Sequence, residues 1–436
     1  MTTMESTDAR SLTDWLAHID RQHPKSIDMG LDRVREVAKR LGLKRPARHV
    51  ITVAGTNGKG STVAFIEAMA RAAGLKVGAY TSPHLLAYNE RVRIDGADVV
   101  DAELIAGFEA IETARLRPRD KDAAVVPLTY FEYGTLCALW LFERADLDLA
   151  VLEVGLGGRL DATNLVDPDV AVITTVDMDH QDYLGNDRET IGFEKAGIAR
   201  AWKPLVLGDD DPPSSVLGHA YAIGASAVRI GCDFFFEPVD VGHWRWREVG
   251  YETVLPLPRL AGAAQLRNAA VAIAALRALD VAVPDAAMAD GVANADLPGR
   301  LQSFARDGVE IVVDVGHNPQ AARGLAAWLL AAPATGRTHA VFAALADKDV
   351  AGVAGALASS IDAWYLAGLV EHSPRGAAVA VLAEGLVGTA AVEGSRHPDV
   401  AQALSAARAV ARPGDRILVF GSFHTAATAL EHLAAD

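Results

Sequence analysis

The sequence predicts an α/β protein of two domains, each built on a mostly parallel β-sheet. Short apolar runs rich in β-branched residues alternate with helical patterns along almost the whole chain, which is typical of parallel strands joined by crossover helices. The 436 residues are too many for a single hydrophobic core. Proline and glycine in Leu297–Arg300 interrupt both patterns, so we place the domains at residues 1–296 and 297–436. One large sheet throughout is the alternative.

In the first domain the apolar runs predict strands at Val50–Ala54, Lys76–Tyr80, Leu149–Val154 and Val170–Thr175. Between them we expect helices at Thr62–Ala73, Asp101–Arg115 and Phe131–Arg144. After Trp202 the pattern changes to short antiparallel strands at Phe234–Phe236, Trp244–Trp246 and Thr253–Leu257. A helix rich in alanine and leucine follows at Gln265–Leu279.

Beyond the boundary the alternation restarts, with strands expected at Ile311–Val315, His339–Ala344, Ala363–Leu366 and Arg416–Phe420. Three of these strands run into loops with polar residues: Asp314–Asn318, Ala346–Asp349 and Gly421–Thr425. Each loop alone could be an ordinary turn. Together they predict a second ligand site at one edge of the second sheet.

Composition excludes several classes of protein. The net charge of −15 argues against a nucleic-acid or acidic-membrane partner. Two cysteines, Cys137 and Cys232, supply neither a disulfide framework nor a metal set, and Cys137 lies in an apolar helical stretch as a core residue would. The N-terminus has no signal-peptide pattern, and no run of about 18 apolar residues is present. We therefore expect a soluble, cytoplasmic protein.

The most informative segment is the glycine-rich turn Gly55–Ser61, which follows an apolar strand directly and precedes a helix. Glycines let backbone N–H groups surround an anion, the helix N-terminus adds partial positive charge, and Lys59 adds a full one. Ser61 is placed to offer its hydroxyl to a nucleotide-bound Mg²⁺. The spacing differs from the usual G-x-x-x-x-G-K-[ST] motif because Gly60 separates Lys59 from Ser61. The turn predicts nucleotide binding and hence a P-loop-type ATPase domain.

Three further residues lie near the expected strand ends of this domain. Glu153 ends an apolar strand, where a carboxylate is suited to hold Mg²⁺; a solvated carboxylate is the alternative. His180 follows a strand among aspartates, as a metal ligand or as a histidine held only by hydrogen bonds, and Mg²⁺ prefers oxygen ligands. For Lys195, on a short helix, the sequence alone favours an unpaired surface lysine.

Taken in order, these motifs resemble those of the Mur ligase superfamily and, within it, the bacterial folylpolyglutamate synthase/dihydrofolate synthase family. The resemblance spans nearly the whole chain. It rests on the Glu153 and His180 segments and on Ser26–Leu31, Gly55–Ser61, Tyr80–Leu85, Glu90–Val92, Leu128–Thr135, Glu194–Gly197, Leu297–Gln302, Asp314–Pro319 and Gly421–Thr425. One departure is Gly316, where the family leads us to expect alanine, a change that should matter little.

The resemblance implies a role for each matching position. The ATP phosphates would be held by Gly58, Lys59, Gly60 and Ser61, and further ATP contacts would come from Asn268, Arg300 and Asp314. Mg²⁺, in two ions, would be held by Ser82, Glu153 and His180, with Lys195 as a carbamate helping the second ion. Lys59, Lys195 and His317 would be the catalytic residues. The pterin would be bound by Asp28, Met29, Gly30, Leu31, Thr129, Tyr130, Phe131, Glu132, Leu160, Asp161 and Ala162.

The resemblance also implies the fold and the reaction. The ATP-binding domain would be of the Mur ligase central type and the smaller C-terminal domain a Rossmann-like glutamate-ligase domain, with the ligand cleft between them. ATP would activate 7,8-dihydropteroate as an acyl phosphate, which L-glutamate attacks to give dihydrofolate; reduced folates would be extended at the γ-carboxylate. His317 and Ser422 are candidates for the glutamate site, and a monomer is expected.

Three alternatives stay open on the sequence. The first is a cell-wall ligase that acts on a UDP-muramoyl acceptor, against which the Tyr130–Glu132 and Asp28–Leu31 segments argue. The second is folylpolyglutamate synthase activity alone. The third is a nucleotide-gated switch without ligation, although Ala346–Asp349 lacks the asparagine of a base-reading N-K-x-D motif.

Overall fold

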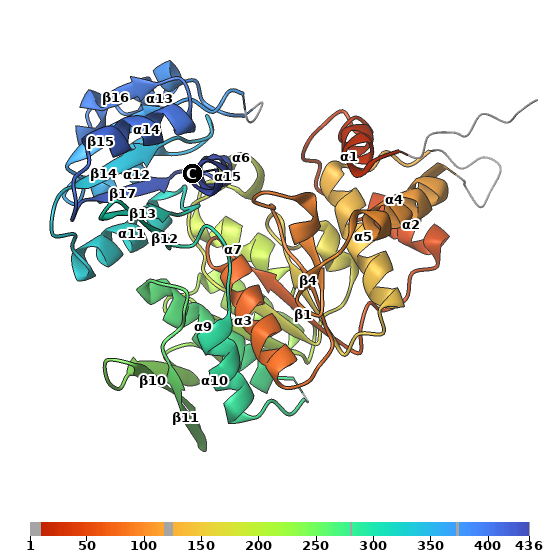
Figure 1. Ribbon diagram of the computed structural model, residues 1–436. Coiled ribbons are helices and arrows are strands. Elements are labelled where there is room, and N and C mark those ends of the chain that lie inside the picture. Colours follow the sequence, from red (N-terminus) through yellow and green to blue (C-terminus); the bar gives the residue numbers. More distant parts are fainter. Residues whose placement is uncertain (1–9, 117–124, 280, 372–374, 436) are drawn as a thin grey trace, which may run out of the picture. The chain divides into compact units, whose positions relative to one another are not determined.

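A computed structural model describes residues 10–116, 125–279, 281–371 and 375–435 (Figure 1). Contacts between residues divide the chain into two compact units. Unit 1 takes the described parts of Met1–Ser82, Tyr88–Leu255 and Ala270–Val292, and unit 2 those of Pro83–Ala87, Pro256–Ala269 and Ala293–Asp436. The described residues form three separate sheets, so the single-sheet alternative is wrong.

Unit 1 is built on an eight-stranded sheet in the order β4-β3-β2-β5-β1-β6-β7-β8. The strands are β1 (His49–Ala54), β2 (Val77–Tyr80), β3 (Val92–Ile94), β4 (Ala97–Asp98), β5 (Leu149–Glu153), β6 (Val170–Ile173), β7 (Pro204–Leu207) and β8 (Ser226–Arg229). From β2 to β8 the neighbours are parallel, whereas β3 and β4 are antiparallel additions at one edge. The four predicted strands are confirmed, with ends shifted by one or two residues.

The helices that accompany this sheet are α1 (Leu12–Asp20), α2 (Asp32–Leu41), α3 (Lys59–Ala72), α4 (Asp101–Leu116), α5 (Tyr130–Arg144), α6 (Gln181–Leu184), α7 (Arg188–Ala196) and α8 (Ser214–Ile223), with 3₁₀ turns η1 (Tyr88–Arg91) and η2 (Ala162–Leu165). Two more, α9 (Ala263–Arg277) and α10 (Asp285–Asn294), run across the division between the units. The predicted start of α3 at Thr62 is wrong by three residues. Gly58, with φ +87°, is its N-cap, so the helix begins at Lys59 within the glycine-rich turn.

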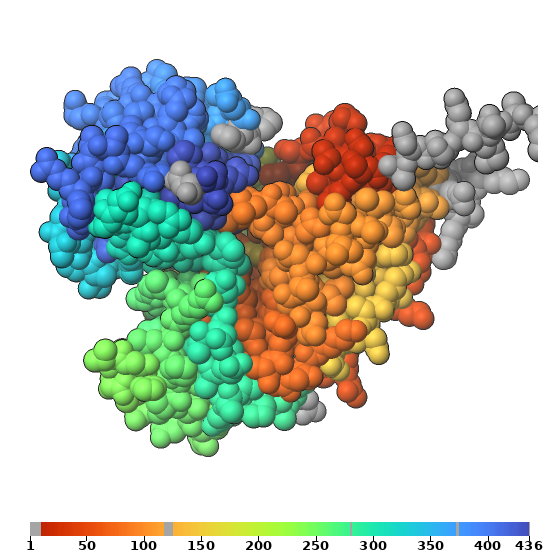
Figure 2. All heavy atoms as spheres, viewed as in Figure 1, coloured from red at the N-terminus to blue at the C-terminus, as the bar shows by residue number. Residues whose placement is uncertain are grey.

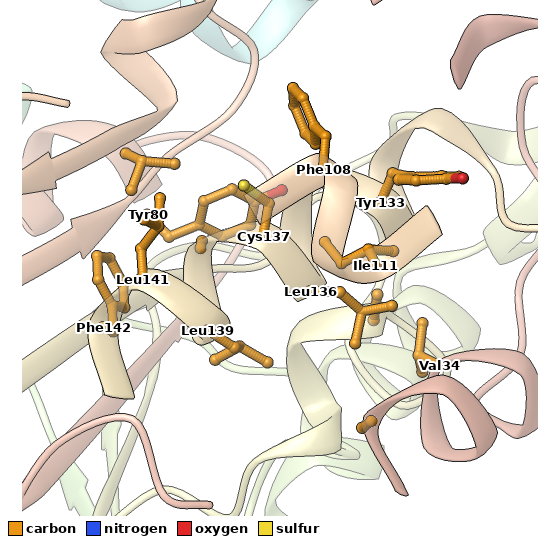
Figure 3. Close-up of a cluster of buried hydrophobic side chains, with 14 of the residues drawn as sticks. Val34, Tyr80, Phe108, Ile111, Tyr133, Leu136, Cys137, Leu139, Leu141 and Phe142 are labelled. Atoms are coloured by element: carbon orange, nitrogen blue, oxygen red, sulfur yellow. The ribbon is translucent and has the colours of Figure 1, made fainter. Parts of the chain in front are cut away.

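Cys137 lies in a buried apolar cluster between α4 and α5 (Figure 3). Its side chain is fully buried beside Phe108 and Tyr80, while Cys232 is exposed, and neither forms a disulfide. Burial raises the pKa of the Cys137 thiol well above its usual range, so the thiol stays neutral and unreactive. The prediction of a core cysteine is confirmed.

A second, three-stranded sheet in the order β11-β10-β9 comprises β9 (Phe234–Pro238), β10 (His243–Glu248) and β11 (Tyr251–Pro256), with β9 and β10 antiparallel as predicted. Trp246 is buried and donates from Nε1 to the carbonyl of Ala270 on α9 at 3.0 Å. Tyr251 donates to Asp285 Oδ1 on α10 at 2.6 Å. These bonds hold the small sheet, green in Figures 1 and 2, beside α10 and the unit 1 part of α9.

Unit 2 contains a six-stranded sheet in the order β12-β13-β17-β14-β15-β16, parallel except for β12. Its strands are β12 (Gln302–Arg306), β13 (Val309–Val313), β14 (Thr338–Phe342), β15 (Ala363–Ala367), β16 (Ser395–His397) and β17 (Arg416–Phe420). The helices are α11 (Pro319–Ala331), α12 (Val350–Leu357), α13 (Val379–Gly385), α14 (Val400–Val410) and α15 (Phe423–Ala434), with the 3₁₀ turn η3 (Ala390–Glu393). The three strands that run into polar loops, β13, β17 and β14, are neighbours. Their loops therefore meet at one edge, as predicted.

The described residues were also compared with the requirements for a membrane-spanning helix. Among them, no helix combines the length and the apolarity needed to span a bilayer.

Replacing Phe108 by alanine should test the cluster in Figure 3. Because this ring is fully buried, we expect Phe108→Ala to lower the free energy of unfolding by about 3–5 kcal/mol through lost burial and a residual cavity. Urea unfolding followed by circular dichroism measures the change. Leu116→Ala on the same helix, at a side chain 44% exposed, is the control and should cost far less. Equal losses for the two variants would contradict the packing.

Candidate active site

The glycine-rich turn between β1 and α3 folds back on itself. Lys59 Nζ donates to the carbonyls of Gly55 at 3.1 Å and Thr56 at 3.3 Å, so the ammonium group stays over the turn. Ser61 is buried in the first turn of α3. A helix N-terminus with its backbone N–H groups, a lysine and a hydroxyl at one turn is a site for a polyphosphate.

The segment that leaves β6 holds this turn in place. Thr174 Oγ1 donates to the carbonyl of Asn57 at 2.6 Å, and Thr175 Oγ1 accepts from the N–H of Asn57 at 3.1 Å. A Cβ on Gly55, whose φ is +150°, would lie 1.8 Å from Thr174 Oγ1. Only glycine fits there. Neither threonine was predicted to hold the turn, although two hydroxyls at a strand exit are a usable signal for such a role.

Glu153 is 5% exposed at the end of β5, so the alternative of a solvated carboxylate is wrong. Its Oε2 accepts a hydrogen bond from the N–H of Ser82 at 3.2 Å. Because β5 lies between β2 and β1, the segment after β2, the carboxylate and the glycine-rich turn share one sheet edge. Two of the three predicted metal ligands are thereby brought together.

Arg93 on β3 lies near Glu153 and contacts the residue before Ser82. Its guanidinium pairs with Glu67 of α3 at 2.8 Å and donates to Thr81 Oγ1, next to Ser82, at 3.2 Å. The carboxylates of Glu67 and Glu153 both contribute to raising the pKa of Arg93, against the opposing effect of burial. The sequence analysis did not single out Arg93.

His180 occupies an unusual backbone conformation. Its φ of +51° is left-handed, and it is the N-cap residue of α6. Its N–H donates to Asp179 Oδ1 at 2.9 Å, and its ring is partly exposed. A non-glycine residue in this region is strained, which is common at functional positions.

The donor chemistry of the predicted metal set suits a hard divalent cation only in part. The described residues contain no group of three or more His, Cys, Asp or Glu side chains placed to hold a metal ion. The predicted set has two such side chains and the hydroxyl of Ser82. Glu153 and Ser82 offer oxygen, as Mg²⁺ prefers, and a Mg²⁺ ion commonly completes its shell with phosphate and water.

Lys195 is 3% exposed, so the preference of the sequence for a surface lysine is wrong. It lies in the last turn of α7, and loss of hydration on burial, followed by the nearby charge of Lys59, lowers its pKa to about 7. Asp179 opposes the shift. Near neutral pH this lysine is therefore present in part as an uncharged, nucleophilic amine.

The glycine-rich loop after Glu153 covers α7 closely. The N–H of Arg159 donates to the carbonyl of Glu194 at 2.8 Å. A Cβ on Gly158 would lie 3.0 Å from the carbonyl oxygens of Glu194 and Lys195, and one on Gly197 would lie 2.3 Å from Arg159 Cβ. Two glycines thus permit the approach that buries Lys195.

Beside this loop is an open cavity of about 760 Å³. It is lined by Pro24, Lys25, Ser26, Ile27, Asp28, Met29, Arg159, Leu160, Asp182, Tyr183 and Glu194. Asp28, Met29 and Leu160 were predicted substrate contacts. Arg159, Asp182, Tyr183 and Glu194 also line the cavity and were not predicted as contacts. Asp182 and Tyr183 lie on α6 and Glu194 on α7, so their position on the wall depends on how these helices pack.

The structure brings the three predicted substrate segments together. The N–H of Gly30 donates to the carbonyl of Leu160 at 3.2 Å. Arg33 joins Asp28 to Glu132, which caps α5 together with Thr129. The remaining residues of these segments are Met29, Leu31, Tyr130, Phe131, Asp161 and Ala162, and the Phe131 ring lies over Gly155.

Asp161 is buried, and burial raises its pKa. Its Oδ2 accepts from the N–H of Leu156 at 2.9 Å and its Oδ1 from the N–H of Thr163 at 3.0 Å. The carboxylate therefore fixes its own loop.

In unit 2, Asp314 organises the segment after β13. Its Oδ2 accepts from the N–H of Leu301 at 2.9 Å and its Oδ1 from the N–H of Gly316 at 2.7 Å. Burial raises the pKa of Asp314, against the opposing charge of Arg300. A Cβ on Gly316 would lie 2.9 Å from Asp314 Oδ1, so glycine at this position does affect the local fit.

The other predicted residues of unit 2 have defined partners. Arg300 stacks on the Phe423 ring, 5.2 Å from its centroid, and His317 Nδ1 lies 3.0 Å from the carbonyl of Val315. Asn268 is buried and donates to Gln265 Oε1 at 3.1 Å. Ser422 is 2% exposed and caps α15 by accepting from the N–H of Thr425 at 3.0 Å. Its hydroxyl therefore has a structural role.

Comparison with known proteins gives consistent matches over both units. The Mur ligase middle domain matches residues 126–276, and the Mur ligase glutamate ligase domain matches residues 299–423. The dihydrofolate synthase/folylpolyglutamate synthase of Escherichia coli is 46% identical over 428 residues, 98% of this chain and 96% of that protein. The Haemophilus influenzae protein of the same name is 39% identical over 447 residues, 98% of each chain.

Several solved structures similar to this chain carry bound molecules. Escherichia coli FolC in complex with DHPP and ADP has a TM-score of 0.90 and 47% identity, and the match covers 98% of each chain. A bifunctional folylpolyglutamate synthase/dihydrofolate synthase with Mn, AMPPNP and L-glutamate bound has a TM-score of 0.88 and 43% identity, over 99% of this chain and all of that one.

Gly55→Ala should disable the glycine-rich turn Gly55–Ser61, called from here on the phosphate turn. The new methyl group would overlap Thr174 Oγ1, so the turn must move and lose hydrogen bonds to a bound phosphate. We expect ATP affinity, measured by calorimetry, to fall on the order of 100-fold, which corresponds to about one lost charge-assisted hydrogen bond. Gly74→Ala is the matched control, because Gly74 also has a positive φ of +83° but has open space around it. Unchanged ATP affinity in Gly55→Ala would refute the assignment of this turn as the phosphate-binding site.

Proposed function

The chain belongs to the dihydrofolate synthase/folylpolyglutamate synthase family of Mur ligases, and we propose that it joins L-glutamate to 7,8-dihydropteroate and to the γ-carboxylate of reduced folates. The activity is that of an ATP-dependent ligase in folate biosynthesis and one-carbon metabolism. The observation that carries the proposal is the meeting of the phosphate turn, Glu153 and the buried Lys195 in unit 1, where the Gly155–Arg159 loop that covers Lys195 also borders the cavity. The full-length matches do not favour a cell-wall ligase.

The nucleotide would be held by its phosphates. Gly58, Gly60 and Ser61 supply backbone N–H groups and a hydroxyl, and Lys59 supplies charge. Ser82, Glu153 and His180 would hold a divalent cation, which when bound offsets negative charge on the phosphates. This role is consistent with the Mn and AMPPNP bound to the relative.

The reaction would proceed in two displacements. An oxygen of the substrate carboxylate attacks the γ-phosphorus of ATP, its bond to the β,γ-bridging oxygen breaks, and ADP leaves. The amine of L-glutamate then attacks the acyl carbon, loses a proton and expels phosphate from the tetrahedral intermediate. Lys59 would offset charge that develops on the transferred phosphoryl group.

Residues 1–296 would form the ATP-binding domain and residues 297–436 the glutamate-ligase domain. Asn268, Arg300 and Asp314 would contact the nucleotide. We assign Asp314 a second role in shaping its own segment, because its carboxylate accepts from Leu301 and Gly316. His317 would lie near the reacting groups, and the protein would act as a monomer.

The folate substrate would occupy the cavity. Asp28 and Met29 of its wall and the neighbouring Thr129–Glu132 and Leu160–Ala162 segments are joined by the hydrogen bonds described above. DHPP bound to the Escherichia coli relative is consistent with this assignment.

Phosphate release by the purified protein with ATP, Mg²⁺ and L-glutamate tests the proposal. We expect release with dihydropteroate and also with tetrahydrofolate, and in each case only when glutamate is present. Release with tetrahydrofolate alone would leave only the folylpolyglutamate synthase activity. Release with neither substrate would overturn the proposed function.

Lys195 would act as a carbamate. Its neutral amine attacks CO₂, an N–C bond forms and a proton is lost, so a cation becomes an anion suited to help hold a second divalent cation. Because the pKa of Lys195 is lowered to about 7, the fraction of its amine that is uncharged increases as the pH is raised from 6 to 8. Carbamate formation should increase over the same range. ¹³C-bicarbonate NMR would detect the new carbonyl carbon.

Removing bicarbonate should lower the rate of the wild-type enzyme, and adding it back should restore the rate. Lys195→Met should have a low rate that bicarbonate does not change. Lys203→Met is the control, because Lys203 is half-exposed and paired with Asp169. No carbamate signal at pH 8, together with full activity without bicarbonate, would refute the modification.

A further inference from the structure

We propose that Arg33 is a positioning residue that fixes one wall of the substrate cavity. It does so by joining the segment 24–31, called here the cavity loop, to the start of α5. The inference rests on the proposed function for the identity of the ligand, but its structural part does not.

Arg33 bridges two segments about a hundred residues apart in the chain. Its Nη1 donates to Asp28 Oδ2 at 2.6 Å, and its Nη2 donates to the carbonyl of Asp28. Its Nε donates to both oxygens of Glu132, at 3.0 and 3.2 Å. The planar guanidinium, with several donors in fixed directions, suits this task, whereas the single ammonium of lysine does not.

On the side of α5, Arg33 neutralises a carboxylate that already has a structural role. Glu132 is 3% exposed, and its Oε2 accepts from the N–H of Thr129 at 2.7 Å. The N–H of Glu132 donates in turn to Thr129 Oγ1, which completes the capping box. Removing Arg33 would leave a buried carboxylate without its cation, which disfavours the present arrangement of this helix start.

On the side of the cavity loop, Asp28 is an internal anchor. Besides Arg33, its carboxylate contacts Lys25 Nζ at 3.1 Å and His23 Nε2 at 3.5 Å. Three cationic or potentially cationic side chains of the chain itself thus surround it. The structure assigns Asp28 the task of holding the loop, in addition to its place on the cavity wall.

The position of the loop defines the cavity. Residues Lys25–Met29 line it, Met29 lies against Gly157 on the neighbouring loop, and the N–H of Gly30 donates to the carbonyl of Leu160. None of the groups that Arg33 bonds belongs to the phosphate turn. A change at Arg33 should therefore weaken binding of the folate substrate and leave that of ATP as it is.

The test compares Arg33→Met and Arg33→Lys with Arg35→Met. Arg35 lies on the same helix, α2, is largely exposed and pairs only loosely with Asp32 at 3.8 Å, so it controls for the loss of an arginine from this helix. For both Arg33 variants we expect the KM for dihydropteroate to rise by about 10–100-fold, as for the loss of about one charge-assisted hydrogen bond. The kcat and the KM for ATP should stay within about threefold of wild type, and Arg35→Met should match wild type.

Hydrogen–deuterium exchange of the ligand-free proteins tests the structural part without any substrate. Exchange in peptides covering residues 24–31 should accelerate in both Arg33 variants but not in Arg35→Met. Peptides of α3 should exchange as in wild type, which also shows that the variants are folded. If Arg33→Met does not fold, Arg33→Lys, which keeps the charge, decides the question.

Unchanged exchange over residues 24–31 in a folded Arg33 variant would overturn the inference. So would equal increases in the KM values for dihydropteroate and ATP, because these would indicate a general disturbance. A wild-type protein that releases no phosphate with dihydropteroate would refute the proposed function instead, while the exchange result would still decide the role of Arg33.

Discussion

The parallel register of β5, β1 and β6 is the constraint on which the rest of unit 1 depends. Val53 pairs with Glu153 and Ala54 with Ile173, so the three strands end side by side. Glu153, the glycine-rich turn and the threonines after β6 consequently emerge at the same edge. The hydrogen bonds that Thr174 and Thr175 share with Asn57 of the turn exist because of this alignment, and the absence of a side chain at Gly55 permits it.

Near the same sheet edge, two ionisable side chains, Lys195 and Glu153, are buried. Lys195 is covered by the Gly155–Arg159 loop and lies near Lys59, and both effects favour its neutral form. Glu153 is buried and its carboxylate accepts from the N–H of Ser82, while Arg93 pairs with Glu67 and lies close enough for its charge to interact with that of Glu153. Burying such groups costs free energy unless each has a partner or a ligand. Replacing such groups by apolar residues of similar volume is often neutral or stabilising, so their burial here is consistent with a chemical role.

The sequence predicted the features that a local pattern of residues marks. It did not predict the burial of a side chain by a segment that is remote in the chain. The strands that end at Ala54 and Glu153 are marked by continuous apolar runs, and the turn between β1 and α3 by its glycines. Nothing in the Glu194–Gly197 segment announces that Lys195 is buried, because the cover comes from a loop more than thirty residues earlier. The strand β8 at the edge of the sheet was also missed, because none of Ser226–Arg229 is fully buried and the segment has no continuous apolar run.

The role of a carboxylate in the substrate segments is equally hard to predict from the sequence. Asp28 and Asp161 lie in segments that the family resemblance marks for ligand binding, and acidic residues there suggest direct contacts. In the structure Asp161 accepts from the N–H groups of Leu156 and Thr163, and Asp28 is bonded to Arg33 and Lys25. Asp161 fixes the loop that contains Leu160, and Asp28 fixes the cavity loop, so each carboxylate holds a segment of the wall in place without a ligand. Residue identity at a motif position therefore specifies the site, but whether a side chain binds the ligand or holds the wall depends on partners that are remote in the sequence.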